Sequence, residues 1–132
     1  MITVELARRL KDVGLPWKPA SGDRFVVADR DMDAEVFVVS QLTIEPRDTP
    51  AGPLFQFNGT TEWALDSVEQ TAVVWLPHEG QLRAALGTAF LRLEPIGDGW
   101  VVTVGRDGRE IREVDVDAER AYARALLAVL GP

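Results

Sequence analysis

The stretch FQFNGTTEWALDSVEQTAVVWLP, residues 55–77, is the part of the sequence from which we expect the fold to be organised. It contains two of the four tryptophans, Trp63 and Trp75, an Asn58-Gly59 turn signal and an apolar run that ends in proline. Large aromatic side chains contribute much of the area that a core buries. We therefore expect burial of these rings to join the first half of the chain to the second.

Apolar periodicity on both sides of this stretch predicts the secondary structure. Helical spacing predicts helices over 3–14, 62–68, 77–87 and 118–130. Strand-like runs lie at 24–28, 35–40, 42–45, 54–57, 72–76, 89–94, 99–104 and 109–116. Short connections predict a hairpin for the first two strands and a meander for the last three. We expect a loop at 46–53, which holds three prolines.

The order of these elements predicts an α+β fold. Strands come in runs, and the helices are set apart from them, which favours an antiparallel sheet with the N- and C-terminal helices packed on it. A chain of 132 residues has the length of one domain, so we expect residues 1–132 to form a single domain. The sequence has no cysteine, and a chain of this size can bury enough surface to fold without a disulfide or a metal.

The net charge of −7 and the isoelectric point near 4.7 bear on the partners of the chain. An acidic surface repels phosphate backbones and anionic lipid heads, so we expect neither a nucleic-acid partner nor membrane insertion. The first residues lack the basic and then apolar pattern of a signal peptide, and the longest apolar run is far below the ~20 residues that span a bilayer. We therefore expect a cytoplasmic protein.

A weak metal candidate lies between the first two predicted strands, where Asp29, Asp31 and Asp33 alternate as in the start of a calcium loop. That loop requires glycine at its sixth position and glutamate at its twelfth, which are Ala34 and Ser40 here. The alternative is a solvated acidic loop that keeps the strand edges soluble. We expect no metal and no other cofactor.

Two features bear on catalysis. Glu62 and Asp66 lie four residues apart and would share a helix face, where they could act in acid/base chemistry or form the wet side of an amphipathic turn. His78 is the single histidine, and its alternatives are a general base or a surface residue at the start of a helix. The sequence has neither a G-x-S-x-G elbow nor a phosphate-binding loop. We expect no catalytic residues, and the balance favours a protein that is not an enzyme.

The tryptophans divide into two groups by their place in the predicted elements. Trp75 and Trp100 fall in strands, and we expect them in the core. Trp17 and Trp63 fall in less regular segments and are better candidates for a contact surface. The segment around Trp63 is the predicted binding site, with these residues: Phe57, Asn58, Thr60, Thr61, Glu62, Trp63 and Asp66.

Four motifs resemble those of a family of small acidic actinobacterial proteins that are often labelled pilus assembly protein CpaE. The motifs are GDRFVV at 22–27, EVFVVS at 35–40, FNGTTEWALDSV at 57–68 and WLP at 75–77. The resemblance covers most of the chain and implies a bacterial cytoplasmic protein linked to a pilus or secretion locus. Because the chain lacks a phosphate-binding loop, the resemblance implies no nucleotide site.

Three functions follow from these observations as hypotheses. The first is a non-enzymatic protein-binding or accessory protein with an unknown protein partner. The second is a small-ligand binder or enzyme that uses Glu62 and Asp66. The third is an immunity-type protein that binds a basic toxin through the acidic residues 29–35. A homodimer is a further open alternative.

Overall fold

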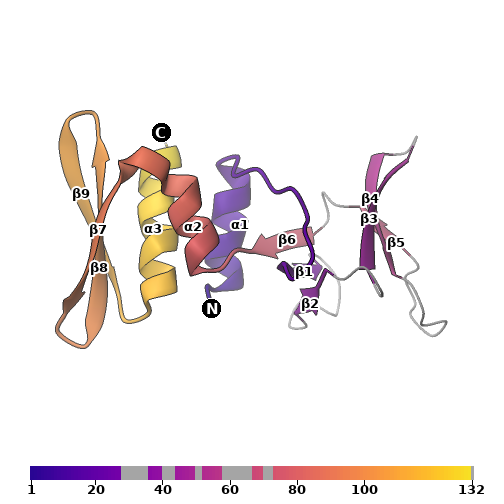
Figure 1. The fold of residues 1–132 in the computed structure, drawn as a ribbon, viewed down its shortest axis with the longest axis horizontal. Coiled ribbons are helices and arrows are strands. Elements are labelled where there is room, and N and C mark those ends of the chain that lie inside the picture. The colour runs from indigo at the N-terminus through magenta and orange to yellow at the C-terminus, as the bar shows by residue number, and fades with distance from the viewer. Residues whose placement is uncertain (28–35, 40–43, 50–51, 58–66, 70–72, 132) are drawn as a thin grey trace. The chain divides into compact units, whose positions relative to one another are not determined.

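The computed structural model describes residues 1–27, 36–39, 44–49, 52–57, 67–69 and 73–131 (Figure 1). The chain divides into two compact units. Unit 1 consists of Met1–Pro16 and Pro77–Pro132, and unit 2 consists of Trp17–Leu76. The prediction that residues 1–132 form one domain stays a prediction.

Unit 1 contains three α-helices and a three-stranded antiparallel sheet of order β7-β8-β9. Its elements are α1 (Val4–Asp12), α2 (Glu79–Leu86), the 3-10 turn η2 (Gly87–Ala89), β7 (Phe90–Ile96), β8 (Gly99–Arg106), β9 (Arg109–Asp115) and α3 (Ala118–Leu130). Helix α3 packs against β8 and β9, and both α1 and α2 pack against α3. Figure 1 shows α3 between the sheet and α1. Helix α3 is therefore the central element of this unit.

The β8–β9 hairpin is fixed by its turn. Asp107 and Gly108 join the two strands, and both have positive φ, at 53° and 75°. A two-residue hairpin turn with positive φ at both positions matches the right-handed twist of the strands, and Asp-Gly is a favoured sequence for it. This turn sets the register that pairs Arg106 with Arg109 and Trp100 with Asp115.

The core of unit 1 lies between the sheet and α3. Val102 and Val104 of β8 are fully buried, as are Tyr122 and Leu126 of α3. The rings of Phe90 and Tyr122 lie 5.7 Å apart between their centroids. Full burial of one such apolar side chain stabilises a fold by roughly 1.5–3 kcal/mol. Packing between the sheet and α3 thus contributes to the stability of unit 1, together with the buried leucines of α1 and α2.

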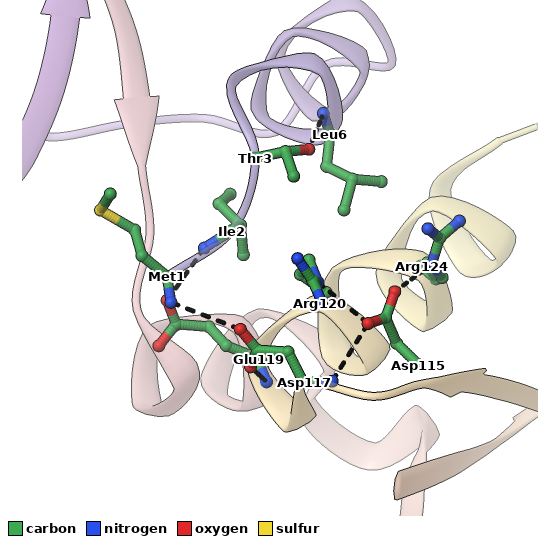
Figure 2. Close-up of polar contacts among 9 residues, drawn as sticks. All are labelled: Met1, Ile2, Thr3, Leu6, Asp115, Asp117, Glu119, Arg120 and Arg124. Carbon is green, nitrogen blue, oxygen red and sulfur yellow. Dashed lines mark hydrogen bonds and ion pairs between the residues drawn. The ribbon is translucent and has the colours of Figure 1, made fainter. Parts of the chain in front are cut away.

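Three acidic residues alternate at the start of α3 and hold it in place (Figure 2). Asp117 is the N-cap, and its carboxylate accepts the N–H of Glu119 at 2.8 Å. Asp115 accepts the N–H of Asp117 at 3.0 Å and the Nε–H groups of Arg120 and Arg124, each at 2.9 Å. Negative charge at a helix N-terminus is favourable because the unpaired N–H groups and the helix dipole point toward it.

The third acid, Glu119, connects α3 to two other segments. Its Oε1 accepts the N–H of Ile2, just before α1, at 3.1 Å, and its Oε2 accepts the N–H of Glu79, the first residue of α2, at 3.0 Å. The Glu119 side chain is only 15% exposed, and the α-amino group of Met1 lies 3.5 Å from it. One carboxylate therefore satisfies backbone donors from segments 117 and 40 residues away.

The described residues of unit 2 form two three-stranded antiparallel sheets, of order β2-β1-β6 and β3-β4-β5. The first consists of β1 (Arg24–Val27), β2 (Phe37–Val38) and β6 (Val73–Leu76), and the second of β3 (Ile44–Thr49), β4 (Gly52–Phe57) and β5 (Ser67–Glu69). Strand β1 pairs with both of its neighbours in register, with Phe25 opposite Phe37 on one side and Trp75 on the other.

The prediction of an α+β fold with an antiparallel sheet and packed terminal helices is confirmed. The first hairpin, the final meander and the last helix with its Asp117 cap are also confirmed. Helix α3 touches the sheet directly, and α1 packs on α3.

Two predicted elements of unit 2 are wrong. The expected loop at 46–53 is largely strand, because β3 and β4 pair from Ile44 opposite Phe57 to Thr49 opposite Gly52. Proline at 46 is compatible with β3 because that strand lies at the sheet edge, where a missing N–H costs no ladder bond. The expected helix at 62–68 is also wrong at its end, where Ser67 and Val68 form β5 and pair with β4; residues 62–66 lie outside the described residues.

Removal of the Glu119 carboxylate should destabilise unit 1. Each buried N–H that loses its acceptor costs about 1–3 kcal/mol, so we expect Glu119→Ala to lower the free energy of unfolding by about 2–4 kcal/mol. Glu119→Gln keeps one oxygen and should cost about half as much. The measurement is urea denaturation followed by circular dichroism. Glu5→Ala, on the exposed side of α1, is the control; equal effects of Glu5→Ala and Glu119→Ala would contradict the role assigned to Glu119.

The ion pairs of Asp115 should make unit 1 sensitive to acid. Burial opposes its ionisation, but the N–H of Asp117 and the guanidinium groups of Arg124 and Arg120 together outweigh burial and hold the pKa of Asp115 below its usual value. A lowered folded-state pKa stabilises the fold above the unfolded value of about 3.9, and this contribution is lost as the pH falls through the folded-state pKa. Asp115→Asn should therefore destabilise at pH 7 and lose less stability on acidification than the wild type.

The measurement for Asp115 is the free energy of unfolding of both chains in urea at neutral and acidic pH. Asp98→Asn, in the exposed β7–β8 turn, is the matched control and should keep the wild-type pH dependence. An unchanged pH dependence in Asp115→Asn would show that the ion pairs do not stabilise the fold.

Candidate functional site

A stacked pair of tryptophans dominates the described part of unit 2. Trp17 is the first residue of the unit, and Trp75 lies near its end in β6. Their ring centroids are 5.9 Å apart and their planes differ by 5°. The chain enters unit 2 just before Trp17 and leaves it just after Trp75. The stack therefore joins the two ends of the segment that forms unit 2.

Asp23 fixes the position of the Trp17 ring. Its Oδ2 accepts the indole Nε1–H of Trp17 at 2.8 Å and the backbone N–H of Ala20 at 3.0 Å. Asp23 is buried, and its carbonyl accepts the N–H of Val39 at 2.8 Å. Gly22 precedes it with φ of 95°, a conformation that favours glycine. A local turn thus presents a buried carboxylate to the indole.

Two phenylalanines extend the stack into an aromatic cluster, which consists of Trp17, Phe25, Phe37 and Trp75. The Phe25 ring lies 5.9 Å from Trp17 and 5.6 Å from Phe37, between centroids. Phe25 and Phe37 are buried, whereas the two tryptophans are half-buried. The Nε1 atom of Trp75 is buried and has no hydrogen-bond partner in the part of the chain that the structure describes. The cluster is a partly exposed aromatic surface on the β2-β1-β6 sheet, which suits contact with another molecule.

The predictions for the four tryptophans have different outcomes in the structure. Trp17 lies in a partly exposed aromatic surface, as its irregular segment suggested, and Trp75 is half-buried rather than fully in the core. The prediction that Trp100 belongs to the core is wrong, because its exposure is 37%. Trp100 is the second residue of β8 and pairs with Pro95 and Asp115, at one end of the sheet. Trp63 lies outside the described residues.

The structure leaves most of the predicted binding residues undescribed. Phe57 is the last residue of β4. The others of that set lie outside the described residues: Asn58, Thr60, Thr61, Glu62, Trp63 and Asp66. The metal candidates Asp29, Asp31 and Asp33 also lie outside them. These assignments therefore stay predictions, including the Glu62 and Asp66 pair.

His78 is exposed at the start of α2, so the interpretation of a surface residue at the start of a helix is confirmed. Its backbone N–H donates to Oε1 of Gln81 at 3.0 Å. This contact satisfies a donor at the helix start, which is a structural role.

Asp23, Asp115 and Glu119 have structural roles that the sequence patterns did not predict. The signal for the last two was the alternation of acids at 115, 117 and 119 just before an apolar helix, which resembles a capping pattern. Their partners come from distant segments, so no local pattern could identify them. Asp23 had no signal beyond its place after a turn glycine.

A groove in unit 1 is lined by Arg9 of α1, Glu113 of β9, and Arg124, Leu127 and Ala128 of α3. Its charges have both signs, and Arg124 is already bound to Asp115.

Within the described residues, no group of three or more acidic, histidine or cysteine side chains is arranged to hold a metal ion. None of the helices that the structure describes is both long and apolar enough to cross a membrane.

Comparisons with protein-family models, curated proteins and solved structures give no match for this chain. The resemblance to the actinobacterial family therefore stays a prediction.

Removal of the Trp17 ring should destabilise unit 2. Trp17→Ala deletes both the stack and the bond to Asp23, and large-to-small changes at packed aromatic positions cost about 3–5 kcal/mol when fully buried. Since Trp17 is half-buried, we expect a loss of about 2–3 kcal/mol. Trp17→Phe keeps a ring but removes the indole donor and should cost about 1 kcal/mol. Urea denaturation monitored by near-ultraviolet circular dichroism measures both.

Trp100→Ala is the control for Trp17→Ala, because Trp100 is a more exposed indole in the other unit. We expect a smaller loss than for Trp17→Ala. If the two variants lose equal stability, the stack does not hold unit 2 together.

Proposed function

We propose that the chain is a non-enzymatic protein-binding or accessory protein, and that unit 2 binds a basic surface on its protein partner. The observation that carries this proposal is the uneven distribution of charge. Unit 2 holds 10 acidic and 4 basic residues, a net charge of −6, whereas unit 1 holds 11 acidic and 10 basic residues, a net charge of −1. Nearly all of the net charge of −7 therefore belongs to 60 of the 132 residues.

Concentrated charge of one sign has a known physical effect on association. It attracts an oppositely charged partner over about a Debye length and raises the rate of encounter. It also rejects partners of like charge, which supports specificity. The aromatic cluster of the same unit adds half-buried indole area, which is typical of the side chains that dominate binding energy. The negative charge of unit 2 attracts a basic partner, and its aromatic cluster adds contact area. Together they favour binding to a protein.

The uneven distribution of charge supports the alternative functions to different degrees. An immunity-type protein that binds a basic toxin is one case of the proposal, since its partner is a basic protein. The resemblance to the actinobacterial family favours a partner encoded at a pilus or secretion locus. The hypothesis of an enzyme or ligand binder depends on Glu62 and Asp66, and the uneven charge gives it no particular support.

The experiment compares two variants that remove the same number of charges from different units. The unit 2 variant carries Asp29→Asn, Asp31→Asn, Asp33→Asn and Glu35→Gln. The unit 1 variant carries Glu5→Gln, Asp12→Asn, Asp98→Asn and Asp107→Asn, all at exposed residues. Both variants and the wild type are immobilised and exposed to a native bacterial lysate, and the bound proteins are identified by mass spectrometry at low and high salt.

We expect the wild type and the unit 1 variant to retain the same basic proteins at low salt, and the unit 2 variant to lose them. High salt should release them, because the Debye length falls from about 10 Å at 0.1 M to about 3 Å at 1 M. Identical retention by the two variants, or retention that ignores salt, would contradict the proposal. Melting temperatures of all three chains control for loss of fold.

A further inference from the structure

The sheet of unit 1 has a second face, which we call the outer face. Strand register places Phe90, Val102 and Asp115 on the side that contacts α3. Because side chains alternate along a strand, the neighbouring positions point to the opposite side. Figure 1 shows no helix of unit 1 on that side of the sheet among the residues described.

The outer face carries more apolar area than a solvent-facing sheet normally does. An antiparallel sheet with one covered face usually presents polar side chains on the other. Here Leu91 at 45%, Ile96 at 43% and Val114 at 52% are exposed. Val101 lies between Glu94 and Val114 in the register, on the same face, but its side chain is buried, with 1% exposure, so the exposed apolar area comes from the two outer strands. Exposed apolar area that recurs on one face marks an interaction surface more often than scattered single residues do.

The charges on the outer face are balanced. Arg92 donates to Glu94 at 2.9 Å and to Glu110 at 3.2 Å, so its side chain reaches from β7 to β9 across β8. Gly105 is the β8 residue opposite Glu110, and the side chain next to it on this face is that of Leu91. Arg112 completes a set of two cations and two anions. Hydrogen bonds from Arg92 lower the pKa of Glu110, which keeps that carboxylate ionised.

We propose that the outer face is the interface of a homodimer, in which the β7-β8-β9 sheets of two copies pack face to face about a two-fold axis. A two-fold interface places the same patch on both partners, so the patch must be complementary to itself. A surface of two Arg, two Glu and several apolar side chains satisfies this condition, because each sign can meet its opposite. A surface of one sign would repel its own copy.

The charge distribution of the whole chain supports a second copy as the occupant. Two molecules of net charge −7 repel each other, and the repulsion is weakest where the local charge is close to zero. Unit 1, with a net charge of −1, offers such a place, and unit 2 does not. A strongly acidic or strongly basic partner would gain from one half of the outer-face charges and lose from the other half.

The size of the β7-β8-β9 sheet determines how tightly we expect the two copies to associate. Three strands about 4.8 Å apart and seven residues long, at about 3.3 Å per residue, cover roughly 14 by 23 Å. That is below the roughly 800 Å² that each partner buries in a standard interface. We therefore expect a weak dimer that forms at high micromolar concentration and dissociates on dilution. This inference concerns unit 1 and does not depend on the function proposed for unit 2.

The test is sedimentation equilibrium of the full chain over a concentration series. The wild type should pass from monomer to dimer as its concentration rises. Val114→Lys and Ile96→Lys each place a charge in the outer face, and each should raise the dimer dissociation constant at least tenfold. Two variants at separate strands guard against the failure of one to fold, which melting temperature and circular dichroism report.

Leu130→Lys is the matched control, because it makes the same change at an apolar residue of similar exposure, 39%, at the end of α3. Its dissociation constant should stay within about twofold of the wild type. A wild type that stays monomeric at the highest concentration would overturn the proposal. So would a dimer that Leu130→Lys weakens as much as Val114→Lys, or a dimer that neither outer-face variant weakens.

Discussion

The carboxylate of Glu119 is the contact on which the arrangement of unit 1 depends. The sheet packs on one side of α3, but α1 and α2 reach α3 from segments that lie far away along the chain. Glu119 accepts one backbone N–H from the start of each of these two segments. Such donors have no partner inside their own helix, and burying them unpaired would cost free energy. The first turn of α3 thus supplies the acceptor for a backbone N–H just before α1 and for another at the start of α2.

The two units use their acidic residues in different ways. Unit 1 uses its acids internally: Asp115 binds Arg120 and Arg124, Asp117 caps α3, and Glu119 binds backbone donors. Its acids and bases nearly cancel, so it contributes little to the field around the protein. Unit 2 has an excess of six acidic residues, and the Trp17–Trp75 stack joins the ends of its segment. A balanced unit and a charged unit in one chain fit a binding protein whose attraction for a partner comes from one part.

The sequence predicts those helices and turns that depend on patterns within a few residues. Periodicity predicts α3, and the Asp107-Gly108 turn predicts the last hairpin, because each signal acts within a few residues. It fails at 46–53, where prolines suggest a loop but β3 and β4 pair, and the edge position of β3 tolerates Pro46. It also misses the roles of Asp23 and Glu119, since a carboxylate does not reveal which distant N–H it will accept. The predicted binding segment around Trp63 lies largely outside the described residues.

Through the contacts at the start of α3, the helices α1, α2 and α3 should form one cooperative unit. Native-state hydrogen exchange, read by NMR at single amides, tests it most directly, because it gives a free energy of opening for each helix in the unmodified chain. We predict that the slowest amides of Val4–Asp12, Glu79–Leu86 and Ala118–Leu130 open with the same free energy. If α1 or α2 opens at a free energy lower than that of α3 by about 2 kcal/mol or more, the three helices are not held as one unit.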